Sequence, residues 1–169
     1  LRRQVAAVGQ GRLRDYRAPA WLVESIEMDV ELGIDASEIS ARLQLRRDPA
    51  QLAPLRLDGE NLQLLSIVLD GRQLPASAYR YDGRLLEVDG VRDGSVLETR
   101  VRVRPAANTA LEGLYLSGPR ETGFLLTQCE AQGFRHITYF PDRPDVQSSY
   151  IVTLRADRAR FPVLLAGGN

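Results

Sequence analysis

Residues 26–32 read Ile-Glu-Met-Asp-Val-Glu-Leu, an unbroken alternation of apolar and acidic side chains. Successive side chains of a β-strand point to opposite faces, so the alternation puts the apolar residues on one face and the carboxylates on the other. Residues 39–46 repeat the pattern, with Ile, Ala and Leu alternating with Ser, Gln and Arg. Two such strands, connected by residues 33–37, predict an antiparallel pair with one buried and one solvated face.

Asp-Gly dipeptides follow this pair, among them those that begin at Asp58, Asp70 and Asp82. Asp-Gly favours tight turns between neighbouring strands, because both residues tolerate a positive φ. Turn signals that recur about every ten residues, with apolar runs between them, are typical of all-β domains. The sequence therefore predicts an all-β fold, an antiparallel β-sandwich or saddle-shaped sheet with little helix.

The same criteria, alternation or an apolar run bounded by turn residues, predict the remaining strands. They are expected at residues 55–57, 61–69, 79–81, 85–88, 96–103, 136–139 and 149–156, with others beginning at residues 124 and 161. Residues 105–118, which begin with Pro and end with Gly, are expected to form a loop.

Length and charge limit the possible classes of function. The chain has 169 residues, the size of one domain, and 22 basic residues, all of them Arg, balance 22 acidic ones. Balanced charge disfavours nucleic-acid binding and attraction to an anionic membrane. No apolar run approaches the roughly 18 residues of a membrane span. The single cysteine, Cys129, cannot form an intramolecular disulfide and suits a reducing compartment, so a cytoplasmic location is expected.

Residues 127–131 read Thr-Gln-Cys-Glu-Ala and follow the apolar run 124–126. If this run is a strand that continues, Gln128 and Glu130 share one face and Cys129 takes the other. A carboxylate beside an amide at a strand end can hold a small cationic group through a charge-assisted hydrogen bond, worth about 1.5–3 kcal/mol. The alternative is that both side chains are merely solvated.

Three blocks, in this order, carry a resemblance to a known family. Residues 15–19 read Asp-Tyr-Arg-Ala-Pro, residues 105–115 read Pro-Ala-Ala-Asn-Thr-Ala-Leu-Glu-Gly-Leu-Tyr, and residues 139–144 read Tyr-Phe-Pro-Asp-Arg-Pro after the Thr-Gln-Cys-Glu segment. Together they resemble the bacterial branch of the aminopeptidase N family of zinc metallopeptidases. The resemblance extends from about residue 14 to residue 169. Arg143 departs from it, because many relatives carry an acidic residue there.

The resemblance implies roles for two residues. Glu130 would bind the free α-ammonium group of a peptide's first residue, and Gln128 would line the pocket for that residue's side chain. In this family two His and a Glu bind zinc and another Glu acts as general base, in a following domain with a His-Glu-x-x-His motif that this sequence lacks. No catalytic residue and no metal ligand is therefore expected in this chain.

These implications define the expected organisation and function. Residues 14–169 would be the amino-terminal β domain of a zinc aminopeptidase, truncated at its C-terminal end, and residues 1–13 a flanking, mobile segment. The domain would anchor peptide N-termini, would need the missing catalytic domain and its zinc, and would be inactive alone. The alternative is a stand-alone β-sandwich binding module without enzymatic activity.

The remaining polar residues near these blocks have structural interpretations. His136 is the only histidine and, with Cys129, cannot complete four-coordinate zinc, so a structural role is expected. Cys129 is expected to face inward. Asp142, Arg143 and Asp145 either line the substrate cleft or face the missing domain, or they form a surface ion-pair cluster worth little.

The block around Asn108 has two interpretations as well. Asn108, Thr109 and Glu112 could position the substrate cleft. The favoured interpretation is that they form hydrogen bonds within their own loop, because Asn and Thr side chains commonly bond nearby backbone groups.

Overall fold

The computed structural model describes residues 16–167, and the expected flanking segment at residues 1–13 lies outside this range. The described residues form three sheets. The largest has the order β11 (Ser149–Ala156), β1 (Trp21–Leu32), β2 (Ser37–Arg47), β8 (Val96–Val103), β4 (Gln63–Leu69) and β5 (Arg72–Gln73). The second consists of β3 (Leu55–Asp58), β7 (Leu85–Val88) and β6 (Tyr79–Tyr81), and the third of β10 (Phe124–Gln128) and β9 (Gly113–Ser117). The helical residues form short 3-10 turns, η2 (Ala76–Ala78), η3 (Pro105–Ala107) and η4 (Phe134–His136).

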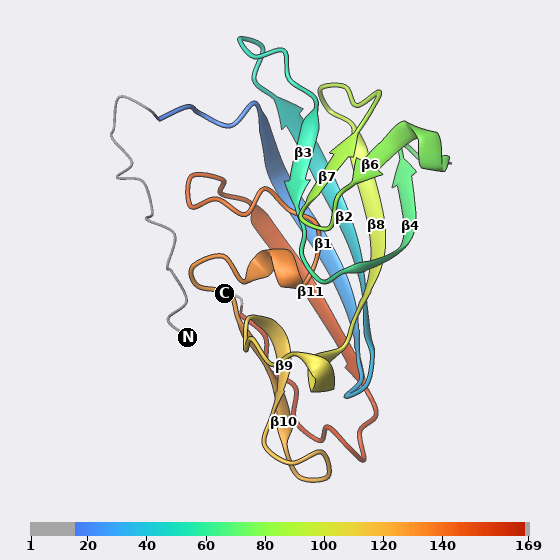
Figure 1. The fold of residues 1–169 in the computed structure, drawn as a ribbon, viewed down its shortest axis with the longest axis vertical. Coiled ribbons are helices and arrows are strands. Elements are labelled where there is room, and N and C mark those ends of the chain that lie inside the picture. The colour runs from blue at the N-terminus through green and yellow to red at the C-terminus, as the bar shows by residue number, and fades with distance from the viewer. Residues whose placement is uncertain (1–15, 168–169) are drawn as a thin grey trace, which may run out of the picture.

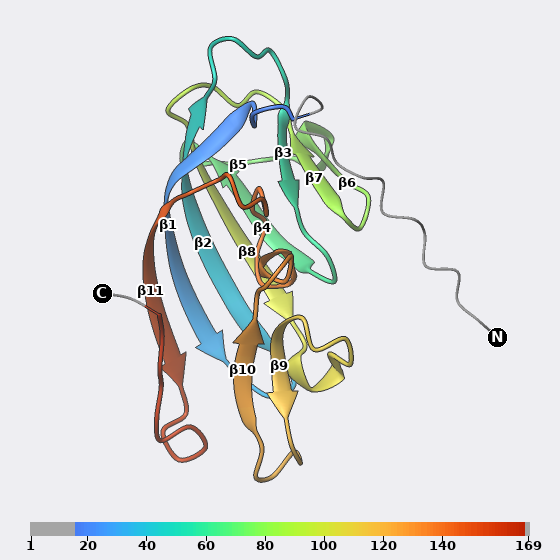
Figure 2. The same cartoon turned by 90° about the vertical axis from the view of Figure 1, so that its left-hand side faces the viewer.

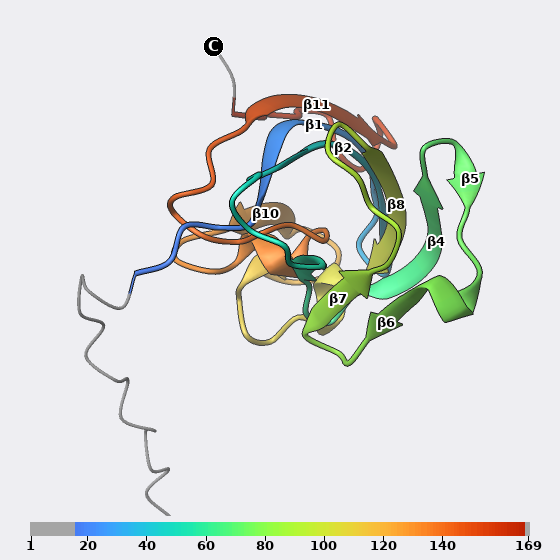
Figure 3. The same ribbon diagram turned by 90° about the horizontal axis from the view of Figure 1, so that it is seen from above.

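The six-stranded sheet is strongly curved and forms one layer of the molecule (Figure 1). Seen from above, it curls around the core, and β7 and β6 lie across from β1 and β2 (Figure 3). The β9–β10 hairpin lies on the same side of the large sheet as β3, β7 and β6 (Figure 2). The predicted all-β sandwich is confirmed, with antiparallel pairing throughout the described sheets except between β1 and β11.

The core lies between the curved sheet and the elements that cover it. The alternation places every second side chain inward in β2 and, from Ile26 onward, in β1, as the sequence predicts, while a bulge between Val23 and Ser25 interrupts it earlier in β1. Fully buried side chains come from both layers: Ile26, Ile39, Leu43, Leu97 and Val101 from the large sheet, and Leu55, Leu57 and Leu86 from the second sheet. Burying each such side chain contributes about 1.5–3 kcal/mol, so this contact between layers is the main source of stability.

Three local expectations are wrong. Residues 136–139 form no strand, because η4 ends at His136 and the backbone turns there. Residues 113–117 are not loop but form β9, which pairs with β10. No strand begins at residue 161, and the described chain is irregular from there to residue 167.

The first error has a clear physical cause. Thr138, Tyr139 and Phe140 are all buried, so the segment is enclosed on all sides and lacks one wet face. Only Phe140 pairs in a strand-like way, through two backbone hydrogen bonds with Asp58 of 2.9 and 3.1 Å. A short apolar run cannot by itself distinguish such a segment from a strand.

Among the described residues there is no helix with the length and hydropathy of a membrane span.

Candidate functional site

The strand that carries Gln128 stops at that residue, and Glu130 lies in the turn that follows. The two side chains are therefore not placed on one face by strand alternation, which corrects the local geometry expected from the sequence. They are linked instead through the backbone, since the Gln128 Nε2 group donates to the carbonyl oxygen of Glu130 at 3.1 Å. Both residues are exposed, and the Glu130–Ala131 peptide bond is cis.

The turn is closed by Gly133, whose backbone N–H donates to the carbonyl oxygen of Cys129 at 2.8 Å. A Cβ at Gly133 would overlap the carbonyl oxygen of Gln128 and lie 2.9 Å from the Cα of Cys129. No larger residue fits without moving the backbone, so glycine lets η4 pack directly onto the turn that carries Glu130.

η4 is in turn anchored by Arg135, whose side chain is 11% exposed. Its Nε donates to Asp142 Oδ2 at 3.0 Å and its Nη2 to the carbonyl oxygen of Asp142 at 3.2 Å. Asp58 completes the cluster: its Oδ1 lies 3.6 Å from Arg135 Nη1, and its Oδ2 accepts from the Asp142 N–H at 3.0 Å. Burial disfavours the charged guanidinium, but the hydrogen bonds and charges of the carboxylates outweigh it and raise the pKa of Arg135. The candidate site therefore rests on a buried, charge-paired support.

The three charged residues of the 142–145 loop have different partners, and only one of them belongs to this cluster. Asp142 points inward to Arg135 and has a supporting role. Arg143 and Asp145 pair with each other at the surface, at 2.6 Å between Nη2 and Oδ2. The hydrogen bond from Arg143, together with one from the Tyr16 hydroxyl, lowers the pKa of Asp145 to about 2.

Cys129 lies half-buried between these elements, beside apolar residues of the core. Burial, and the nearby negative charge of Asp142, raise the pKa of its thiol. A thiol held protonated is a poor nucleophile. This half-buried position agrees with the inward-facing orientation expected for Cys129.

His136 and Asn108 both bond within the structure around the site. The His136 Nε2 atom lies 3.2 Å from Glu112 Oε2, and its Nδ1 lies 3.4 Å from Asn61 Nδ2. Asn108 donates to the carbonyl oxygens of Glu112 and Leu114, at 2.7 and 3.0 Å. These bonds agree with the structural role expected for His136 and with the bonding to nearby backbone groups expected for Asn108.

The Asn108 loop is brought to the site by strand pairing, because Gly113 in β9 is opposite Gln128 in β10. A Cβ at Gly113, where φ is +70°, would lie 2.6 Å from the Cβ of His136. Two of the blocks that carry the family resemblance therefore meet here through one residue pair.

Sequence reasoning missed an aromatic surface beside the site. Tyr150 of β11 is 48% exposed, and its ring centroid lies 5.9 Å from that of Phe134 and 6.2 Å from that of Phe140. Phe124 at the start of β10 is 61% exposed. The sequence shows that Tyr150 and Ile151 lie on opposite faces of the predicted strand. Which of these faces is left uncovered depends on the tertiary fold.

Within residues 16–167 no group of three or more His, Cys, Asp or Glu side chains is placed to hold a metal ion. The described part of the chain therefore offers no fit for zinc.

Comparisons with known proteins relate nearly the whole chain to one kind of enzyme. It is 46% identical over 157 residues to aminopeptidase N of Caulobacter vibrioides, a match that covers 93% of this chain and 18% of that protein. Aminopeptidase N of Escherichia coli is 41% identical over 155 residues, which cover 92% of this chain and 17% of that protein. The chain thus spans less than a fifth of the length of these curated relatives. No family model matches.

Solved structures give the same relationship. The structure of Legionella pneumophila aminopeptidase A in complex with aspartic acid superposes with a TM-score of 0.80 and 27% identity, covering 94% of this chain and 18% of that one. An M1 zinc metallopeptidase from Deinococcus radiodurans, bound to a Tyr-Ser-Ala substrate, has a TM-score of 0.64 at 14% identity and covers 81% of this chain and 33% of that one. The second similarity concerns the fold alone.

Proposed function

We propose that this chain, related to aminopeptidase N along nearly its whole length, is the amino-terminal, substrate-anchoring domain of a zinc aminopeptidase that removes N-terminal residues from peptides. The observation that carries the proposal is the 46% identity over 93% of the chain, which includes the Gln128–Glu130 turn. A stand-alone binding module, the alternative, does not account for a match to one small part of a much longer enzyme.

In this role Glu130 receives the substrate's α-ammonium group. Its carboxylate is exposed, while its backbone is held by Gln128 and by the turn closed at Gly133. A carboxylate on a fixed backbone can accept a charge-assisted hydrogen bond worth about 1.5–3 kcal/mol. Because the backbone is already ordered, binding does not lose free energy to ordering it. Gln128, at the end of β10, would contact the side chain of the first residue.

The zinc ion would be bound by the part of the enzyme outside this chain, since the described residues hold no ligand set. A zinc ion in such an enzyme polarises the attacking water. This chain would contribute by positioning the substrate. Because it fixes the ammonium group, it places the first peptide bond one residue away from the anchor.

The remainder of the enzyme is the proposed protein partner of this domain. Phe124 and Tyr150 are exposed aromatic side chains at the starts of β10 and β11, and Val163 and Leu165, beyond β11, are 70% and 86% exposed. Large exposed apolar surfaces commonly mark an interface. We propose that they pack against the catalytic domain. The cytoplasmic location remains a prediction, which fractionation of the source cells would test.

The test compares the isolated chain with the protein encoded by the complete gene. The complete protein is expected to release N-terminal residues from peptides with a free amine, to lose activity with a chelator, and to ignore N-acetylated peptides. The isolated chain is expected to release nothing and to bind no stoichiometric zinc. Chelator-sensitive release by the isolated chain, or a complete protein that lacks this activity, would overturn the proposal.

A further inference from the structure

The outer face of the six-stranded sheet, away from the core, is rich in arginine, and most of these arginines have a carboxylate of their own. Arg46 lies 3.4 Å from Glu24, and Arg155 binds Asp29 at 2.7 Å. Arg42 lies between two acids, at 3.8 Å from Glu27 and 3.6 Å from Glu98. Over this part of the described face, each arginine is paired with at least one carboxylate.

At the end of β8 the arginines outnumber the carboxylates that pair with them. Arg100 and Arg102 alternate along the strand and both bind one acid, Glu38 of β2. Arg104 follows directly after β8, and no side chain among residues 16–167 pairs with it. On the other flank of β8, the partners of Arg100 and Arg102 in β4 are the neutral residues Ser66 and Gln63. Two guanidinium groups therefore share a single carboxylate, and the third, that of Arg104, has none among the described residues.

Unused donors remain on all three arginines: Arg100 uses only Nη2 for Glu38, and Arg104 makes no side-chain hydrogen bond within residues 16–167. Arg102 uses Nε and Nη2 for Glu38 Oε1, at 3.1 and 2.6 Å, so its Nη1 makes no hydrogen bond within the described residues. The hydrogen bonds from Arg102 and Arg100 lower the pKa of Glu38, which stays charged at neutral pH. Since Glu38 is one unit charge, it cannot neutralise the whole row.

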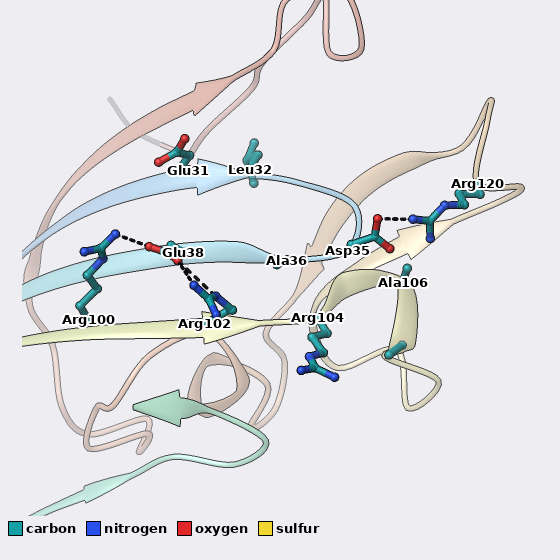
Figure 4. A pocket seen from close by; sticks show the side chains of 11 residues that line it. Glu31, Leu32, Asp35, Ala36, Glu38, Arg100, Arg102, Arg104, Ala106 and Arg120 are labelled. Carbon is teal, nitrogen blue, oxygen red and sulfur yellow. Dashed lines mark hydrogen bonds and ion pairs between the residues drawn. The ribbon is translucent and has the colours of Figure 1, made fainter. Parts of the chain in front are cut away.

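The row lines a cavity of about 950 Å³ (Figure 4). Arg120, from the connection between β9 and β10, closes one side and is paired with Asp35 of the β1–β2 turn. Glu31, the remaining acid of the lining, lies on β1, two strands away from β8. Four arginines thus face three acids, and the surplus charge lies at Arg104.

A second cavity of about 580 Å³ adjoins the first, and Arg102, Arg104 and Ala107 line both. It adds neutral polar side chains, including Asn61 and Thr109, that can donate hydrogen bonds. Arg102 and Arg104 therefore lie between the two cavities. The smaller cavity offers neutral polar side chains, and the larger one is lined by the other arginines.

We propose that Arg102 and Arg104 form a binding site for a small oxyanion of the phosphate class, carried by a free ligand. A phosphate group has enough acceptor oxygens to bridge two guanidinium groups, and the planar donor fork of Arg matches it. The two oxygens of Glu38 are already used by Arg100 and Arg102, so this carboxylate does not serve Arg104. The cavity leaves room for a substituent on the phosphate. This inference concerns different residues from the Glu130 anchor and does not depend on the proposed function.

The probe is pyrophosphate, titrated into the chain by isothermal calorimetry and by NMR of the arginine Nε–Hε groups. Saturable binding with a millimolar or lower dissociation constant is expected, with shifts at Arg102 and Arg104. Arg104→Gln should weaken binding about tenfold or more, because it removes a charge-assisted contact. Since Arg104 pairs with no described residue, the variant should keep the circular dichroism spectrum and melting temperature of the wild type.

The matched control is Arg46→Gln, which removes the same charge from the same sheet outside both cavities. It should leave pyrophosphate affinity unchanged. Equal weakening in both variants, or a response that sodium chloride reproduces at matched ionic strength, would show general charge attraction and overturn the proposal. Binding to the isolated chain but not to the complete protein would also overturn it, because the arginines would then be covered by the rest of the polypeptide.

Discussion

The backbone N–H of Gly133 lies 2.8 Å from the carbonyl oxygen of Cys129, and this hydrogen bond fixes the turn that carries Glu130. The contact joins the end of a hairpin strand to the start of η4. Because η4 is itself held by the ion pairs of Arg135, the position of an exposed carboxylate depends on side chains that are largely buried.

Gly133→Ala should destabilise the chain by about 1–3 kcal/mol, because the added methyl group has no space between Gln128 and Cys129. Urea unfolding followed by circular dichroism measures the change. The control is Gly167→Ala, since nothing lies within 4 Å of a Cβ at that position. If the two variants are equally stable, the close packing described for Gly133 is wrong.

Arg135→Met should cost about 2–4 kcal/mol of unfolding free energy, because it leaves Asp142 and Asp58 without their cation in a largely buried setting. Arg46→Met removes an exposed arginine from a pair with Glu24 and should cost less than about 1 kcal/mol. Chemical denaturation of both variants gives the comparison. A loss at Arg135 no greater than that at Arg46 would contradict the supporting role of the buried cluster.

Asp145 should titrate with a midpoint near 2, well below its ordinary value, because Arg143 and Tyr16 hydrogen-bond to the ionised carboxylate. A lowered pKa means that the ionised form stabilises the fold above the unfolded-state value, which is about 3.9, and that this stability is lost as pH falls toward 2. NMR titration of the Asp145 carboxyl carbon measures the midpoint. In Arg143→Gln it should rise toward about 3.9, and a midpoint still near 2 would show that another group holds the charge.

Glu130→Gln, made in the complete enzyme, should lower kcat/KM for free-amine peptides about 10- to 150-fold, because one charge-assisted contact is lost. Part of the loss should appear in kcat, since the anchor also positions the peptide bond. Zinc content, measured by atomic absorption, should be unchanged. Gln128→Ala should instead change the ranking among first-residue side chains. A kcat/KM within twofold of the wild type for every free-amine substrate would refute the anchoring role of Glu130.

The sequence by itself determined the features that depend on neighbours along the chain. Side-chain alternation placed β1 and β2 and the boundaries of β8 and β11, because the two-residue period of a strand is written in adjacent residues. It also singled out Gln128 and Glu130, through their type and their place after an apolar run. That the chain itself holds no zinc, argued from its single histidine and single cysteine, stays a prediction.

Only the tertiary structure decided which distant segments meet. The parallel pairing of β11 with β1 joins Ser25 to Ser149, and no local pattern specifies such a partner. The charges of Arg135 and Asp142 meet a third group, Asp58, at the end of β3, more than 75 residues earlier in the chain. Burial on all sides also removed the alternation that would have revealed the conformation of residues 136–139. These features arise from contacts between chain segments, and a period read along one segment carries no information about them.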